Sequence, residues 1–92
     1  MIWQKPKMVH GKMTKYGWVP YYPENITLGE RVDIGFFSFI QAGANVWIGD
    51  DVQIGGGSFI YSIDSIGGNK GAVIIQKGAK ILFGSLKGIG FQ

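Results

Sequence analysis

The fold is decided by residues 28–66, which read LGERVD-IGFFSF-IQAGAN-VW-IGDDVQ-IGGGSF-IYSIDS-I. A branched aliphatic residue opens every block of six, and a glycine usually follows it. The fifth place of a block holds a small or β-branched residue, as in Val32, Ser38, Ala44, Val52 and Ser58. A fixed period of six predicts a hexapeptide-repeat β-helix, in which each block forms a short strand and a tight turn. Three blocks then make one triangular coil.

The aliphatic residue of each block is expected to point into the prism. The glycine after it turns a corner or lets neighbouring backbone approach closely, and successive coils pair at about 4.8 Å. An amphipathic helix would need apolar residues at i, i+3, i+4 and i+7, which this stretch does not offer. The predicted inward-facing residues are Leu28, Ile34, Ile40, Ile48, Ile54 and Ile60, and the frame returns at Ile75 and Ile81.

Two interruptions break the period. Val46 and Trp47 stand between two blocks and are predicted to bulge at a corner. A third coil is predicted to begin at Ile66 and to be interrupted by an external loop over residues 67–71. Within that loop, Asn69 and Lys70 are candidate ligand-binding residues, because a glycine-rich loop with a lysine can cradle phosphate. The P-loop spacing is absent, and a plain hairpin-like excursion of the chain is the alternative.

Residues 1–23 lack the period, so the chain divides into a leader with an aromatic cap, residues 1–23, and a β-helix, residues 24–92. Pro20 and Pro23 favour an extended run over a helix. Trp18, Tyr21 and Tyr22 are expected to cap the open end of the prism, since a solenoid needs a capping segment. A platform for a sugar or base ring is the alternative function of these rings.

Composition narrows the function classes. Sixteen of 92 residues are glycine, which suits a solenoid that turns often. The absence of cysteine excludes disulfides, a thiol nucleophile and a thiolate metal site. The net charge is +3, with all six acidic residues between 24 and 64 and four lysines on either side of that segment. This pattern is not a nucleic-acid stripe; it indicates solvated ends or attraction for a phosphorylated ligand. No apolar run reaches 18 residues, so we expect a cytoplasmic protein without a membrane partner.

Several aromatic residues fall at outward or edge places of the repeat. Four phenylalanines and a tryptophan exceed what a thin monomer should expose to water, namely Phe36, Phe37, Phe39, Phe59 and Trp47. The interface candidates among them are Phe37, Phe39, Trp47 and Phe59. They predict an interface with a partner chain, and the alternative is that some of them fold inward at the corners.

Over residues 26–85 the sequence resembles the hexapeptide-repeat acyltransferases, and the run 23–29 into the repeats is most similar to their sugar and nucleotide-sugar acetyltransferases. The resemblance implies an all-β, left-handed parallel β-helix of about three coils, whereas the general rule for parallel crossovers favours the right hand. It also implies a homotrimer with sites between the prisms. The reaction would transfer an acetyl group from acetyl-coenzyme A, as cosubstrate, to a sugar hydroxyl or amine.

In that family a histidine in or beside the coils usually acts as general base, because imidazole titrates near neutrality. His10 is the only histidine here, and it lies outside the repeat. It is the catalytic candidate, with an ordinary polar residue as the alternative. The related γ-carbonic anhydrases need three histidines for zinc, so no metal is expected.

The family's enzymes usually have further coils and a coil-associated histidine, and the sequence shows neither. Two expectations therefore stand beside each other: an acetyltransferase, or a shortened relative of one, and a non-catalytic trimeric structural or binding module of the same fold. An unrelated all-β binding protein is the third. Trimers stacked end to end are one way to cover the open C-terminal edge.

Overall fold

The computed structural model describes residues 2–64 and 69–88, and these contain no α-helix. A single 3-10 turn, η1 (Pro23–Asn25), accompanies short strands. The strands are β1 (Val19–Tyr21), β2 (Ile26–Leu28), β3 (Asp33–Ile34), β4 (Phe39–Gln41), β5 (Val46–Ile48), β6 (Gln53–Ile54), β7 (Phe59–Tyr61), β8 (Ile63–Asp64), β9 (Asn69–Lys70), β10 (Val73–Ile75), β11 (Lys80–Ile81) and β12 (Leu86–Gly88).

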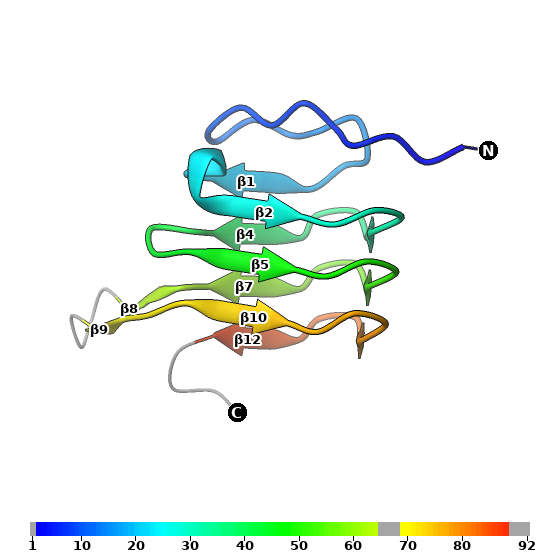
Figure 1. Ribbon diagram of the computed structural model, residues 1–92. Helices are drawn as coiled ribbons and strands as arrows, with labels where there is room; N and C mark the ends of the chain where they lie inside the picture. The colour runs from blue at the N-terminus through cyan, green and yellow to red at the C-terminus, as the bar shows by residue number, and fades with distance from the viewer. Residues whose placement is uncertain (1, 65–68, 89–92) are drawn as a thin grey trace.

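Three parallel sheets form the body of the protein (Figure 1). Sheet A has the order β1-β4-β7-β12, sheet B the order β10-β5-β2, and sheet C the order β11-β6-β3. The chain visits sheets B, C and A in turn and then returns to sheet B, so three consecutive strands make one circuit. The hairpin β8–β9 is antiparallel and stands apart from the three sheets. The protein is therefore all-β with parallel strands, an arrangement compatible with the predicted β-helix.

The strand register gives the spacing between circuits. Ile26 pairs with Val46, 20 positions along the chain, and the other strands of the first two circuits repeat that offset. Val46 pairs with Val73, 27 positions along, because the β8–β9 hairpin lies between β7 and β10. Each regular circuit is thus two residues longer than three blocks of six.

The predicted core is confirmed. The six predicted inward-facing aliphatic residues of the first two circuits and Ile75 are at most 4% exposed, and Ile81 is half-buried against the core. The strand register stacks these residues in columns, such as Leu28, Ile48 and Ile75. Four of the five predicted fifth-place residues are also buried, namely Val32, Ser38, Val52 and Ser58. Ala44 is only half-buried because it lies in the longer turn between sheets A and B.

The buried serines bond to backbone inside the turns. Ser62 Oγ donates to the Gln41 carbonyl at 3.0 Å and accepts from the Ala44 N–H at 2.9 Å. Ser58 Oγ donates to the Gly55 carbonyl at 2.6 Å. The hydroxyls therefore pair turn groups such as the Ala44 N–H and the Gly55 carbonyl, whereas the Gln41 carbonyl also accepts from the Ser62 backbone N–H at 2.9 Å.

The glycine after each aliphatic residue has the predicted role of close approach. At Gly35, an added Cβ would lie 2.6 Å from the Gly56 Cα and closer still to the Gly56 nitrogen. The Gly35 N–H donates to the Ile54 carbonyl of the next circuit at 2.8 Å. The two backbones touch at this point, which leaves no room for a side chain.

Two predictions about interruptions are wrong. Val46 and Trp47 do not bulge, because they belong to β5 and pair with β2 and β10, and Val46 is fully buried. The two extra residues of the circuit lie instead in the turn over residues 42–45. The third circuit begins at β10, where Ile75 takes the place predicted for Ile66; Ile66 itself lies outside the described residues.

The leader joins the sheets through β1, which pairs with β4. Trp18 is 1% exposed and belongs to the core, so it covers the first circuit as predicted. Tyr21 lies half-buried and Tyr22 lies exposed, so these two rings do not share the capping position of Trp18. Figure 1 shows the leader crossing over the first circuit, at the end of the stack that carries the N-terminus.

Candidate functional site

The turn from sheet C into sheet A carries the most exposed large apolar side chains of the repeat. Phe36 and Phe37 are 66% and 68% exposed in the first circuit, and Leu82 and Phe83 are 79% and 81% exposed in the third. We call these four residues the apolar edge. Water contact over so much apolar surface is unfavourable, so the edge is the first candidate for a contact surface.

A gap divides the apolar edge. The same turn of the second circuit is Gly55-Gly56-Gly57, and a Cβ added at Gly57 would meet nothing within 4 Å. Phe36 leans away toward Gly17, whose α-carbon its ring covers. Two strand spacings, about 10 Å, separate the first circuit from the third. The edge therefore presents two apolar ridges with a bare backbone floor between them.

Aromatic rings stack along the outer face of sheet A. The Phe39 and Phe59 rings lie 5.5 Å apart with an interplanar angle of 22°, and Tyr21 stacks on Phe39 at 6.3 Å and the same angle. Tyr61 meets Phe59 edge-on at 6.3 Å. Because the rings between β1 and β7 cover one another's faces, they stabilise the sheet more readily than they offer a platform to a sugar ring.

The four predicted interface residues do not share one face. Phe37 lies on the apolar edge, and Phe39 and Phe59 lie beside it on sheet A. Trp47, 40% exposed, lies on sheet B, where Ile74 is its neighbour in register and is 58% exposed. Among the described residues, the predicted interface residues therefore fall on different apolar patches: the apolar edge with Phe59, and the sheet B patch of Trp47 and Ile74.

His10 has a structural position. Its Nδ1 accepts a hydrogen bond of 2.9 Å from the Tyr22 backbone N–H. Its ring lies edge-on to Tyr21 and Tyr22, with centroids 5.4 and 4.8 Å away. In the neutral ring the proton is then on Nε2, so neither nitrogen is placed to accept a proton from a substrate.

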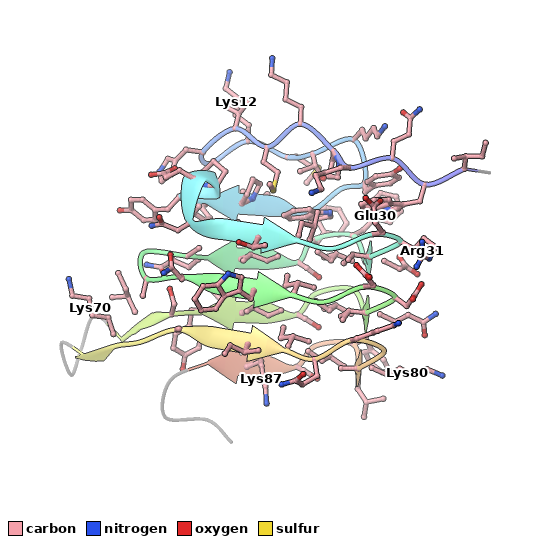
Figure 2. The ribbon with its side chains drawn as sticks, in the orientation of Figure 1. Lys12, Glu30, Arg31, Lys70, Lys80 and Lys87 are labelled. Carbon is pink, nitrogen blue, oxygen red and sulfur yellow. The ribbon has the colours of Figure 1, made fainter. Side chains whose placement is uncertain are left out.

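Lys70 and the Asn69 backbone form β9 of the antiparallel hairpin, which agrees with the alternative prediction of a hairpin-like excursion. Lys70 is exposed, and Figure 2 shows its side chain pointing away from the sheets; the Asn69 side chain lies outside what the structure describes. His10 contacts the end of β1, whereas the hairpin follows β7, two strands away along sheet A. The structure does not bring His10 and Lys70 into one site.

Charged residues line the turn from sheet B to sheet C. Arg31 binds Asp51 of the next circuit in a two-pronged ion pair, with 2.6 Å from Nε to Oδ1 and 3.2 Å from Nη2 to Oδ2. The hydrogen bond from Arg31 lowers the pKa of Asp51, and the same bond raises the pKa of Arg31. Both side chains are exposed, so this pair belongs to the surface and not to a closed reaction site.

The last circuit has a lysine in an inward column. Lys87 of β12 pairs in register with Ile60, which itself pairs with Ile40, so it follows two core residues in the same column. Figure 2 shows Lys87 pointing away from the sheets at the C-terminal end of the stack. An inward-column charge of this kind discourages pairing with another sheet edge.

Within residues 2–64 and 69–88, no group of three or more His, Cys, Asp or Glu side chains is arranged to hold a metal ion. In the same part of the chain, no helix is long and apolar enough to cross a membrane.

Leu82 and Phe83 were missed as contact residues at the level of sequence. The signal was present, because Leu82 stands where the repeat puts glycine, directly after Ile81. A large apolar residue at a corner place cannot enter the core, so it must face outward.

Comparison of the chain with protein-family models, curated proteins and solved structures found no match.

Proposed function

We propose that the chain is a left-handed hexapeptide-repeat β-helix that acts as a self-associating, non-catalytic structural or binding module. The observation that carries this proposal is the apolar edge with its glycine gap. The confirmed core columns support the hexapeptide frame. The left hand is supported by Figure 1, in which β2, β5 and β10 run to the right in front and β4, β7 and β12 run to the left behind, while the chain descends.

The area of the apolar edge supports self-association. Aromatic side chains offer about 150–250 Å² each, so four large side chains at these exposures present on the order of 500 Å². That is close to the upper range for the largest apolar patch of a monomer, about 300–600 Å². A stable interface takes about 800 Å² from each partner; the edge and Phe59 supply most of that area on one side of the contact.

The positions of the two apolar patches favour a closed ring over a two-fold dimer. A two-fold contact uses one patch twice, whereas a ring uses two different patches on each copy. The apolar edge and the sheet B patch are two such surfaces. In the proposed trimer, the sheet B patch of one copy packs against the apolar edge of the next, and an apolar side chain enters the glycine gap.

End-to-end stacking receives less support than lateral contact. The leader carries Lys5, Lys7, Lys12 and Lys15, and the last circuit carries Lys77, Lys80 and Lys87, so both ends of the stack are positive. Figure 2 shows the labelled members Lys12 and Lys87 at opposite ends. Like charges brought together repel each other, and Lys87 also occupies the column that a stacked circuit would continue.

Sedimentation equilibrium tests the proposal through the mass in solution, with about 30 kDa expected, three times 10.1 kDa. Phe37→Asn removes a ring from the edge and suits the backbone, because Phe37 has φ +62° and asparagine tolerates that region. Loss of a buried ring of this size should weaken association at least tenfold. Ile2→Asn, which removes an exposed apolar side chain outside the edge, is the matched control.

A monomer at all concentrations up to the millimolar range would refute self-association. If Phe37→Asn and Ile2→Asn weaken association equally, the apolar edge is not the surface through which the copies associate.

Transfer of an acetyl group from acetyl-coenzyme A remains a prediction from the sequence. It has less support than the non-catalytic module, because His10 Nδ1 is bonded to the backbone of the leader. Calorimetry with acetyl-coenzyme A tests it directly. Binding at about one site per chain would place the transferase ahead of the non-catalytic module, whatever the oligomeric state.

A further inference from the structure

The leader presents lysines and exposed apolar side chains at the N-terminal end of the stack. Residues 1–23 contain four lysines and no acid, and Figure 1 shows the leader crossing over the first circuit at that end. Figure 2 shows Lys12 pointing away from the sheets there. Three apolar side chains of the same segment are exposed, namely Ile2 at 87%, Val9 at 41% and Met13 at 53%. The apolar edge and the sheet B patch use none of them.

Burial alternates along the part of the leader around Pro6, which decides the side to which each side chain points. Pro6 is buried and Met8 packs against the core, so these two face the stack. Lys5, Lys7 and Val9 are exposed between and beside them. In extended chain, alternate side chains share one side and lie about 7 Å apart. The three therefore form an outward row of two positive charges and one apolar side chain.

A tight turn places Lys12 and Met13 beside this row. The Lys12 N–H donates to the Val9 carbonyl at 3.0 Å, and Gly11 adopts a φ of +73° within the turn. The Gly11 N–H donates to the Pro20 carbonyl at 2.8 Å, which attaches the turn to β1. Val9, Lys12 and Met13 are therefore held together on a turn that is fixed to the sheets.

We infer that this face of the leader binds the surface of an anionic lipid bilayer. The lysines attract the negative headgroups, and each strengthens binding about fivefold. Val9 and Met13 enter the boundary between headgroups and acyl chains, where apolar side chains leave water. The expectation of no membrane partner rested on the lack of an apolar run long enough to span a bilayer, and surface binding needs no such run.

Other partners fit the leader less well. Single-stranded nucleic acid stacks its bases on open aromatic faces, but the Trp3 and Tyr16 rings are half-buried against the core and Lys15 lies over the Tyr16 ring. The exposed Tyr22 ring already meets His10. An acidic protein would pair with the lysines but offer polar groups to the aliphatic side chains, which gain nothing there. A second copy has no acid on its own leader to pair with these lysines.

The test is sedimentation of the folded protein with vesicles of phosphatidylcholine, either alone or with about 30% phosphatidylserine. We expect at least tenfold tighter binding to the mixed vesicles, and weaker binding as salt screens the lysines. The double variant Lys5→Gln/Lys7→Gln should weaken binding to mixed vesicles at least tenfold. The matched control Lys70→Gln/Lys80→Gln removes two exposed lysines outside the leader and should stay within twofold of the parent protein.

Met13→Gln tests the apolar part of the contact, because glutamine keeps the length of the side chain and removes its apolar end. This variant should weaken binding about fivefold at every salt concentration. The effect of the Lys5→Gln/Lys7→Gln variant should instead shrink as the salt concentration rises.

Three results would overturn the inference. One is equal binding, or none, to the two kinds of vesicle while circular dichroism shows a folded protein. Another is equal weakening by the two lysine variants, which would assign the attraction to net charge alone. The last is binding that Met13→Gln leaves unchanged; the leader would then bind polyanions through charge, and single-stranded RNA should compete with the vesicles. The inference does not rest on self-association, because the residues of this face belong to one chain.

Discussion

Gly35→Ala should destabilise the protein by about 2–3 kcal/mol, because the new methyl group meets backbone and not a flexible side chain. An added Cβ would lie 2.6 Å from the Gly56 Cα, and ordinary contact requires roughly 3.5 Å. The first and second circuits must therefore separate locally by nearly 1 Å. Two hydrogen bonds span this contact, from Gly35 N–H to the Ile54 carbonyl at 2.8 Å and from Gly57 N–H to the Phe36 carbonyl at 2.9 Å.

The magnitude follows from those bonds. Each contributes about 0.5–1.5 kcal/mol, and the shifted strands also lose core contacts. With about 1 kcal/mol for those core contacts, the gross loss is about 2–4 kcal/mol. Alanine restricts the unfolded chain and returns about 0.4–1 kcal/mol, which leaves about 2–3 kcal/mol. In a domain of this size the melting temperature should fall by roughly 10 °C or more.

Gly57→Ala is the matched control on the same turn. Its Cβ would meet nothing within 4 Å, so only its φ of +71° resists the substitution. A left-handed backbone conformation costs a non-glycine residue about 1–2 kcal/mol. As at Gly35, alanine restricts the unfolded chain and returns about 0.4–1 kcal/mol. We expect a loss of about 1 kcal/mol, clearly smaller than the loss for Gly35→Ala.

Urea unfolding followed by circular dichroism measures both losses. The protein concentration must be held fixed, because association stabilises the folded state, and equal m-values would show that the unfolded states are comparable. If Gly35→Ala costs no more than Gly57→Ala, the close contact between circuits does not limit the side chain at that place, and the argument for the glycine is wrong.

Three further predictions concern single side chains. Asp51→Asn should lower the melting temperature at pH 7 and have a smaller effect near pH 2. The reason is that Arg31 holds the pKa of Asp51 below its ordinary value in the folded protein. The resulting stabilisation is present above the pKa of the unfolded state and is lost as the pH falls through the pKa of the folded state. An equal effect at both pH values would contradict the ion pair. His10→Ala should lower the free energy of unfolding by about 1–2 kcal/mol, because it removes one hydrogen bond to Tyr22 and two ring contacts. Calorimetric melting measures this loss, and no loss would show that His10 does not hold the leader in place. Ser62→Ala should cost about 1–3 kcal/mol in urea unfolding, because it leaves the Ala44 N–H unpaired, whereas the Gln41 carbonyl keeps the Ser62 backbone N–H; a neutral result would mean that water replaces the hydroxyl.

Much of the fold could be predicted from the sequence because the period of six has a direct physical cause. A residue such as Ile54 is inward at each repeat, and a glycine such as Gly35 is required where two backbones touch. Both constraints act between neighbouring circuits, so they recur along the chain and are visible without coordinates.

The location of the extra residues in the circuit could not be read in the same way. The sequence shows two residues beyond three blocks of six between Leu28 and Ile48, which do pair 20 positions apart, but it does not show which two lie outside the strands. The extra residues lie in the turn that contains Ala44, and a turn carries no repeating core residue to mark its length. For the same reason Val46 was predicted to bulge, although pairing on both sides holds it in a strand.

The candidate sites were harder to predict because they depend on which segments are neighbours. The proposed lipid-binding face of the leader depends on which of its residues pack against the first circuit, such as Pro6 and Met8, and the leader has no period. The apolar edge joins Phe36 to Leu82 through a circuit whose turn has no side chains. Neither arrangement has a signal in the sequence until the contacts between the segments are known.

Phe37 combines an unfavourable backbone conformation with an exposed apolar ring. Its φ of +62° is a conformation that costs a residue with a side chain about 1–2 kcal/mol, and its ring is 68% exposed. The corresponding residues of the next circuits, Gly57 and Gly84, adopt the same backbone conformation without that cost. An isolated chain would thus be more stable with glycine or asparagine at this place. Burial of the ring against a second copy offsets both costs, which is why Phe37 is the residue whose replacement best separates stability from assembly.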